Sequence, residues 1–181
     1  MMVQTEAKYF GMISNDYTDR GAERSTRMRN SREETVRKAL LENYGNYYRL
    51  AYSYTHREAD AMDIVQEGAY RAMLKANTLR EERLAETWIY RIMINAAKEH
   101  LRKYGTVYEE LDADHISGKD CPDLELRAVV DGLPMHERTL IILRFYEDKT
   151  LDEMADILRL NVNTVKSRLY RTLEKLRREL T

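Results

Sequence analysis

Residues that cross-link or interrupt a chain are scarce in this sequence: its 181 residues include one cysteine, two prolines and seven glycines. Because Cys121 is the single cysteine, an internal disulfide framework and a zinc site of several thiolates are excluded, and we interpret it as a small linker residue in a reducing compartment. No apolar run is long enough to cross a bilayer, and the N-terminus lacks the basic-then-apolar order of a secretion signal. We therefore expect a cytoplasmic protein with no membrane insertion of its own.

An overall excess of one charge is also lacking, since the formal net charge is −1, but the charges are unevenly distributed. Acids dominate between Tyr108 and Asp131, and the segment 105–122 also holds two glycines and a proline. This composition predicts a flexible acidic linker between two small domains. Residues 1–30 show no sustained periodicity, and we expect them to form a mobile N-terminal extension.

The alternating pattern of β-strands is absent, and helical periodicity takes its place. A capping-box pattern at Ser31 and Glu34 predicts a first helix that runs to about Thr55. Further helices are predicted over residues 58–76, 85–104 and 123–131, followed by a Gly-Leu-Pro break at residues 132–134 and more helix. The expected fold is therefore all-α, with two small helical domains joined by the linker.

The stretch 148–171 reads as a helix-turn-helix with a cationic second helix. From Val162 onward, apolar residues recur at spacings of three and four, which builds one buried stripe, and Glu174 and Glu179 are the only acids up to the C-terminus. The remaining faces carry amides, hydroxyls, lysines and arginines. Such a surface suits the phosphates and base edges of duplex DNA.

Two other helix faces carry a distinctive pattern. Asp60, Asp63 and Glu67, with Gln66 alongside, form an acidic strip on the second helix, which is also compatible with helix capping or an ordinary solvated face. Gly68 within that helix suggests close packing or an approaching partner. On the third helix, a face of cations and an amide, with two aromatic residues near its start, suits a nucleic-acid strand; a solvated basic face is the alternative. Its residues are Trp88, Tyr90, Arg91, Asn95, Lys98 and Arg102.

Several of these segments resemble a known family. Residues 133–146, 151–158 and 164–171 resemble region 4 of the extracytoplasmic-function (ECF) group of sigma-70 family transcription initiation factors. The segment 60–67 resembles region 2.2 of that group, and residues 88–95 with 101–103 resemble regions 2.3 and 2.4. The resemblance covers about residues 32–181 and implies region 2 as a three-helix bundle over 31–104 and region 4 over 123–181.

The resemblance implies a role for each surface. Core RNA polymerase would be bound through its beta-prime clamp helices and its beta flap, with the clamp contacts made by Asp60, Asp63, Gln66 and Glu67. The non-template strand of the minus-ten element would be captured by a loop near residues 77–86 and the third helix, through Asn77, Thr78, Trp88, Tyr90, Arg91, Asn95, Lys98 and Arg102. The minus-thirty-five element would be read in the major groove by Asn161, Asn163, Thr164, Lys166, Ser167, Arg168 and Arg171.

The resemblance further implies a protein that is no enzyme, uses no cofactor or metal, and is held inactive by an anti-sigma factor, often a membrane-bound one. The four histidines are scattered and form no metal-binding pattern. One departure is Arg159, where the family commonly has a glycine: either Arg159 adopts a left-handed conformation, at a cost of about 1 kcal/mol, or the turn differs slightly from that of the family. The alternative function is a stand-alone helix-turn-helix regulator, which would leave the acidic strip and the cationic third helix unexplained.

Overall fold

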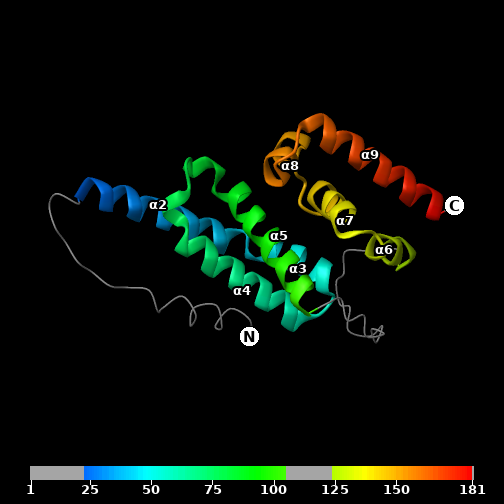
Figure 1. Cartoon of the computed structure of the whole chain (residues 1–181), viewed down its shortest axis with the longest axis horizontal. Helices are drawn as coiled ribbons and strands as arrows, with labels where there is room; N and C mark the ends of the chain where they lie inside the picture. Colours follow the sequence, from blue (N-terminus) through cyan, green and yellow to red (C-terminus); the bar gives the residue numbers. More distant parts are fainter. Residues whose placement is uncertain (1–22, 105–123, 181) are drawn as a thin grey trace.

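The computed structural model describes residues 23–104 and 124–180, which form helices and no β-strand (Figure 1). This confirms the all-α prediction. The N-terminal domain contains α2 (Glu23–Glu42), α3 (Tyr44–Thr55), α4 (Glu58–Leu74), the short helices η1 (Ala76–Thr78) and η2 (Glu82–Leu84), and α5 (Ala85–Tyr104). The C-terminal domain contains α6 (Leu124–Asp131), α7 (Met135–Ile141), the π-helix η4 (Ile142–Tyr146), α8 (Leu151–Leu158) and α9 (Val162–Glu179). None of the described helices is long and apolar enough to span a membrane.

The prediction of a single first helix from Ser31 to about Thr55 is wrong in two respects: the helix begins earlier, and it is divided into α2 and α3. Helix α2 begins at Glu23, so residues 23–30 of the expected extension are helical, and Ser31 lies inside the helix with its Oγ 2.7 Å from Glu82 Oε1. The helix then ends near Asn43, whose side chain donates to the Ala39 carbonyl at 3.1 Å. An asparagine side chain that bonds a backbone carbonyl competes with the hydrogen bonds of the helix. Gly45, two residues later, further disfavours a continuous helix. Residues 1–22 and the predicted linker lie outside the described residues.

Helices α4 and α5 approach closely at Gly68. Ala61, Ile64, Val65 and Ala72 of α4 are buried, as their spacing predicts. A Cβ atom at Gly68 would lie 2.2 Å from the Sδ atom of Met93, a residue of α5 with no exposed surface. The glycine is therefore explained by packing of the two helices.

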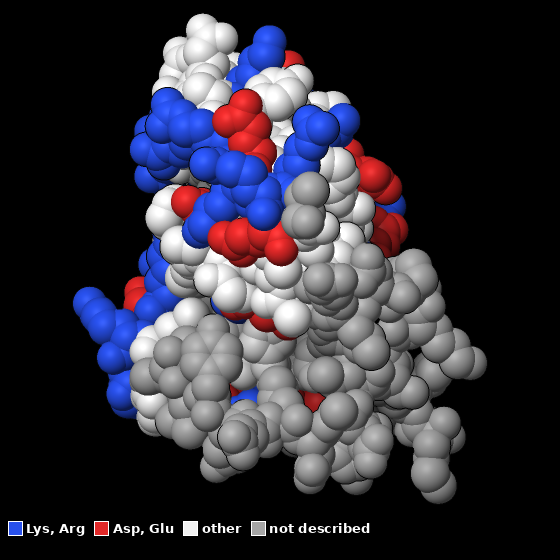
Figure 2. Space-filling view, turned by 90° about the vertical axis from the view of Figure 1, so that its right-hand side faces the viewer, with Lys and Arg blue, Asp and Glu red and all other residues white. Residues whose placement is uncertain are grey.

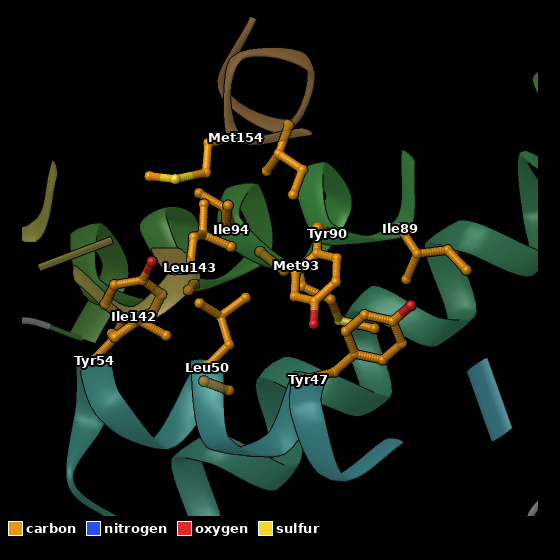
Figure 3. Close-up of a cluster of buried hydrophobic side chains, with 14 of the residues drawn as sticks. Tyr47, Leu50, Tyr54, Ile89, Tyr90, Met93, Ile94, Ile142, Leu143 and Met154 are labelled. Atoms are coloured by element: carbon orange, nitrogen blue, oxygen red, sulfur yellow. The ribbon is translucent and has the colours of Figure 1, made fainter. Parts of the chain in front are cut away.

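The two domains share one apolar core. Figure 3 shows side chains of α3 and α5 meeting those of η4 and α8, with Leu143 lying between α3 and α5 and Met154 above α5. Leu143 and Met154 have no exposed surface, and Ile94 of α5 is 3% exposed. Burying side chains of this size stabilises a contact by about 1.5–3 kcal/mol each. In this arrangement the C-terminal domain is packed onto α3 and α5 of the N-terminal domain (Figure 1).

Hydrogen bonds cross the same boundary, which we call the domain seam. Tyr90 Oη donates to Glu147 Oε2 at 2.6 Å. Tyr54 Oη lies 2.7 Å from Thr139 Oγ1; because that hydroxyl donates to the Met135 carbonyl, the tyrosine is the donor. Such pairs satisfy polar groups that burial would otherwise leave without partners.

Arg138 of α7 makes several hydrogen bonds at the seam. Its side chain is 5% exposed, and Nη1 donates to the Ser53 carbonyl at 2.7 Å and lies 3.3 Å from His56 Nε2. His56 ends α3 in a left-handed conformation and lies 3.5 Å from an Asp131 carboxylate oxygen. A guanidinium is favoured at the C-terminal end of a helix, where backbone carbonyls carry partial negative charge. Arg138 therefore fastens the C-terminal domain to the end of α3.

The close approach at Gly68 leads to a prediction for stability. Gly68→Ala should lower the free energy of unfolding by about 1–2 kcal/mol, because overpacking against Met93 outweighs the gain in helix propensity. Gly45→Ala is the matched control: its added Cβ meets only Arg49 Nη1, at 4.0 Å, so this variant should gain about 0.5–1 kcal/mol. Chemical denaturation measures both values. Equal stabilisation by the two substitutions would contradict the packing role of Gly68.

Burial of Glu147 leads to a prediction for pH dependence. Burial raises the pKa of Glu147 above its usual range, against the opposing effects of the hydrogen bond from Tyr90 and the charge of Arg49. Because the folded pKa exceeds the unfolded one, this group stabilises the fold below the unfolded pKa, and that contribution is lost as pH rises through the folded pKa. Glu147→Gln should therefore gain stability relative to the unmodified protein as pH rises from 4 to 8. Denaturation at a series of pH values measures the difference, and one that stays constant with pH would rule out this effect.

Candidate functional site

The acidic strip lies on the solvent side of α4. Asp63, Gln66 and Glu67 are exposed, and Asp60 is half-buried, with its carboxylate oxygens 3.5 Å from Arg57 Nη1 and 3.7 Å from His100 Nε2. The spacings of three and four place these side chains on one face, as expected from helix geometry. All four predicted residues of this set are therefore brought together.

A groove runs beside the strip between α4 and α5. It has a volume of about 590 Å³ and is lined by Asp63, Gln66 and Glu67 from the strip. The aromatic rings of Tyr70 and Tyr104, which are 63% and 58% exposed, also line it. An exposed apolar surface beside carboxylates suits a protein partner that supplies both apolar and cationic side chains. The sequence reading missed these two tyrosines, although Tyr70 follows Gln66 and Glu67 at spacings of four and three on the same helix.

Arg71 fixes the end of the strip. Its Nε is 2.6 Å from Glu67 Oε1, and its Nη1 is 2.6 Å from Glu99 Oε2 of α5. The hydrogen bonds to Glu99 and Glu67 raise the pKa of Arg71. This network links α4 to α5 and holds the Glu67 carboxylate at the groove.

The predicted strand-binding residues of α5 divide into two groups. Asn95, Lys98 and Arg102 are exposed, and they lie on one face with Arg91 and Trp88, which are half-buried nearer the start of the helix. Arg91 lies at the domain seam, where its Nε donates to the backbone carbonyl of Asp156 in α8 at 2.8 Å. The structure thus leaves the C-terminal half of this face open and covers part of its N-terminal half.

Tyr90 does not lie on this face. The ring has no exposed surface, packs edge-on against Tyr47 with centroids 5.0 Å apart, and bonds Glu147. Successive residues on a helix are rotated by about 100°, so Tyr90 stands about 200° from Trp88 and belongs to the core. Its expected role on an exposed base is therefore corrected to a role in packing.

Asn77 and Thr78 occupy η1, the short helix after α4, and both are exposed. The Asn77 carbonyl accepts from Arg32 Nη1 at 3.0 Å, and Thr78 Oγ1 donates to the Lys75 carbonyl at 2.8 Å. These bonds fix the backbone of the loop against α2. Both side chains stay on the surface.

The helix-turn-helix forms as predicted. Thr150 and Glu153 make a reciprocal capping box at the start of α8, and the backbone and side-chain hydrogen bonds from Thr150 lower the pKa of Glu153. Arg159 in the turn has a φ of 55°, so of the two alternatives the structure has the left-handed residue in place of glycine. Asn161 then caps α9 by accepting the Asn163 backbone N–H at 2.9 Å.

The outer face of α9 carries the predicted duplex-reading residues. Val165, Leu169, Thr172 and Leu176 are buried, which orients the other side chains outward. Among the predicted residues, Thr164 is half-buried, and those exposed are Asn161, Asn163, Lys166, Ser167, Arg168 and Arg171. Figure 2 shows lysines and arginines gathered on the upper part of one side of the molecule, with some acids between them. This surface can contact phosphates and base edges at the same time.

Two family models match the chain: Sigma-70 region 2 over residues 40–106 and Sigma-70, region 4 over residues 123–176. RNA polymerase sigma factor SigV of Bacillus subtilis is 40% identical over 141 residues, which cover 75% of this chain and 85% of the relative. ECF RNA polymerase sigma factor SigW of the same organism is 31% identical over 153 residues, which cover 74% of this chain and 82% of the relative.

Solved structures show the same fold. The sigma factor RpoE from Bartonella quintana, in complex with the anti-sigma factor NepR, aligns with a TM-score of 0.67 at 24% identity and covers 80% of this chain and 95% of its own. CnrH, in complex with the cytosolic domain of CnrY, aligns with a TM-score of 0.63 at 20% identity and covers 82% and 96%. Sequence relatives, family models and fold agree with the predicted resemblance. The chain belongs to the ECF group of sigma-70 family RNA polymerase sigma factors.

Proposed function

We propose that this protein binds core RNA polymerase, directs it to specific promoters and helps to open the DNA, adding no catalytic step of its own. The observation that carries this proposal is the separation of two surfaces: the strip on α4 exposes carboxylates, whereas α9 exposes cations and amides. One protein can therefore hold an enzyme and DNA simultaneously, since the partners need surfaces of opposite character. The sigma-factor relatives support the same role.

Each surface receives one partner in this proposal. The acidic strip docks on the beta-prime clamp helices, and region 4 also meets the beta flap. Asn77, Thr78, Trp88 and the cationic face of α5 bind the non-template strand of the minus-ten element after it separates. Helix α9 enters the major groove of the minus-thirty-five element, where each good base contact contributes about 1–3 kcal/mol of discrimination.

An anti-sigma factor is the proposed regulator. The two structural neighbours were solved with anti-sigma partners, NepR and the cytosolic domain of CnrY. We infer that a comparable protein holds this chain inactive in the bacterial cytoplasm, and that a membrane-bound one would hold it at the membrane.

A stand-alone helix-turn-helix regulator is less well supported. Such a protein needs no exposed acidic strip on its other domain, and the relatives are sigma factors. Run-off transcription with purified core polymerase on a promoter library tests the choice directly. Transcripts that start at defined sites only when this protein is added support the proposal. Tight binding of the protein alone to duplex DNA, with no such transcripts, would favour the regulator.

The acidic strip generates the first functional prediction. The double variant Asp63→Lys with Glu67→Lys should weaken binding of core polymerase at least about tenfold, because like charges at an interface cost several kcal/mol. Glu34→Lys with Glu42→Lys is the matched control, since it makes the same change of charge on exposed positions of α2. Pull-down titration with core polymerase measures both. Normal assembly by the strip variant would refute the docking assignment.

The recognition helix generates the second functional prediction. Arg168→Ala should lower transcription from promoters that depend on the upstream element by about fivefold to a hundredfold, which corresponds to losing a contact of about 1–3 kcal/mol. Binding of core polymerase should stay unchanged. Lys38→Ala, which removes an exposed cation from α2, is the control. An equal loss of polymerase affinity in the Arg168 variant would contradict a role confined to DNA.

A further inference from the structure

The connection between α4 and α5 lies beside α2 (Figure 1). It contains η1, which carries Asn77 and Thr78, and η2, after which α5 begins. A 3-10 helix of three residues leaves most of its carbonyls and N–H groups without a helical partner, so neither short helix can hold its conformation alone. The geometry of residues 76–84, which we call the strand loop, therefore depends on contacts from outside it.

Two consecutive residues of α2 supply such contacts. Arg32 Nη1 donates to the Asn77 carbonyl at 3.0 Å, and Ser31 Oγ donates to Glu82 Oε1 at 2.7 Å. The first bond fixes η1 and the second fixes η2, so neighbouring positions on one helix hold both ends of the strand loop. Each bond includes one charged group, which makes it stronger than a bond between neutral groups.

The core holds the middle of the strand loop. Leu79 is 2% exposed and belongs to the same apolar cluster as Val36 of α2, which has no exposed surface. Val36 follows Arg32 by four residues, so both lie on one face of α2. Thr78 and Arg80, on either side of Leu79, are exposed. With the strand loop fixed at both ends and in the middle, these two residues face solvent, where a nucleic-acid strand can reach them.

The part of α2 that makes these contacts precedes the matched family region. The region 2 model begins at residue 40, after Ser31, Arg32 and Val36, whereas the strand loop lies inside the match. Ser31 stands within α2 and not at its cap, so its hydroxyl is used for the strand loop. Residues outside the family match thus fix the geometry of a loop within it.

We propose that Ser31 and Arg32 are positioning residues for capture of the minus-ten strand. They act through the strand loop, which they hold in a shape that presents Asn77, Thr78 and Arg80 to the separated strand. A loop that is fixed before binding loses little conformational entropy on binding and keeps its contacts in the geometry that distinguishes one base from another. This inference rests on the proposed function, because it assumes that the strand loop binds the minus-ten element.

A double-mutant cycle on Ser31 and Glu82 tests the proposal in the assembled holoenzyme. Ser31→Ala and Glu82→Ala each break the same hydrogen bond. With Bacillus subtilis core polymerase, the rate of promoter opening is measured by a fluorescent adenine analogue in the minus-ten element of a promoter found by run-off transcription. Each single variant should slow opening by about threefold to tenfold, and the double variant should be no slower than the slower single one. Effects that multiply would overturn the role of this bond.

Arg32 is tested through its donor group. Discrimination is the ratio of opening rates on two promoters that differ at one minus-ten base. Arg32→Met keeps the length of the side chain but cannot donate to the Asn77 carbonyl, and it should lower discrimination by about tenfold. Arg32→Lys keeps a donor and should stay within about threefold of the unmodified protein.

Arg37→Met is the matched control for Arg32. It removes the same cation from α2 at a position where the guanidinium bonds Glu34, and it should change discrimination by less than about twofold. Equal losses in the two methionine variants would assign the effect to net charge and overturn the positioning role.

Polymerase affinity and folding separate this inference from the proposed function. Titration with core polymerase should show changes of less than about twofold in all these variants, and thermal unfolding checks that each one folds. Ser31 is exposed, so Ser31→Ala leaves the core intact and the cycle remains a test even if an Arg32 variant unfolds. Unchanged opening and discrimination, in variants that bind polymerase, would overturn the positioning role alone. If the unmodified protein supported no specific transcripts, the proposed function would fail, and this inference with it.

Discussion

The packing of α5 is the constraint on which the rest of the structure depends. One side of this helix fills the core of region 2 through Ile89 and Met93, which have no exposed surface, and Ile94 meets the core of region 4. A helix used on two sides has a narrow strip left for function. The cationic face is therefore confined to residues spaced by three and four, from Trp88 to Arg102. The position of α5 also fixes both walls of the groove beside the strip, because Gly68 lets α4 approach Met93.

Electrostatics then separates the partners. Arg71 holds the Glu67 carboxylate at the groove, and Asp60 lies in the first turn of α4, where the helix dipole favours an acid, while α9 presents its cations on the other domain. Opposite charges on distant surfaces prevent either one from neutralising the other. The domain seam uses a third kind of contact, in which buried tyrosine hydroxyls and Arg138 pair with carbonyls, a carboxylate and a hydroxyl. Such polar pairs fix the alignment of the domains, and the apolar core supplies most of the contact energy.

Sequence periodicity predicted the second and third helices and the helix-turn-helix almost to their ends, because an amphipathic stripe such as Val165, Leu169 and Leu176 has a single way to be buried. The missing turn glycine left two alternatives at Arg159, of which the structure has the left-handed residue. The prediction was wrong on the first helix, where Ser31 matched a capping pattern that the fold uses for a contact with Glu82. The prediction that Tyr90 shares the strand-binding face with Trp88 was wrong as well. It rested on two aromatic residues near the start of the helix and ignored the rotation of about 200° between them.

The sequence by itself determined which surfaces exist. Helical spacing alone places Asp63 beside Glu67, and burial of the apolar stripe of α9 directs Arg168 outward. Tertiary structure decided which of them are accessible. Whether Arg91 meets solvent or the Asp156 carbonyl depends on contacts between residues far apart in the chain. Local periodicity carries no information about such pairs, because the free energy that selects them comes from the burial of two domains against each other.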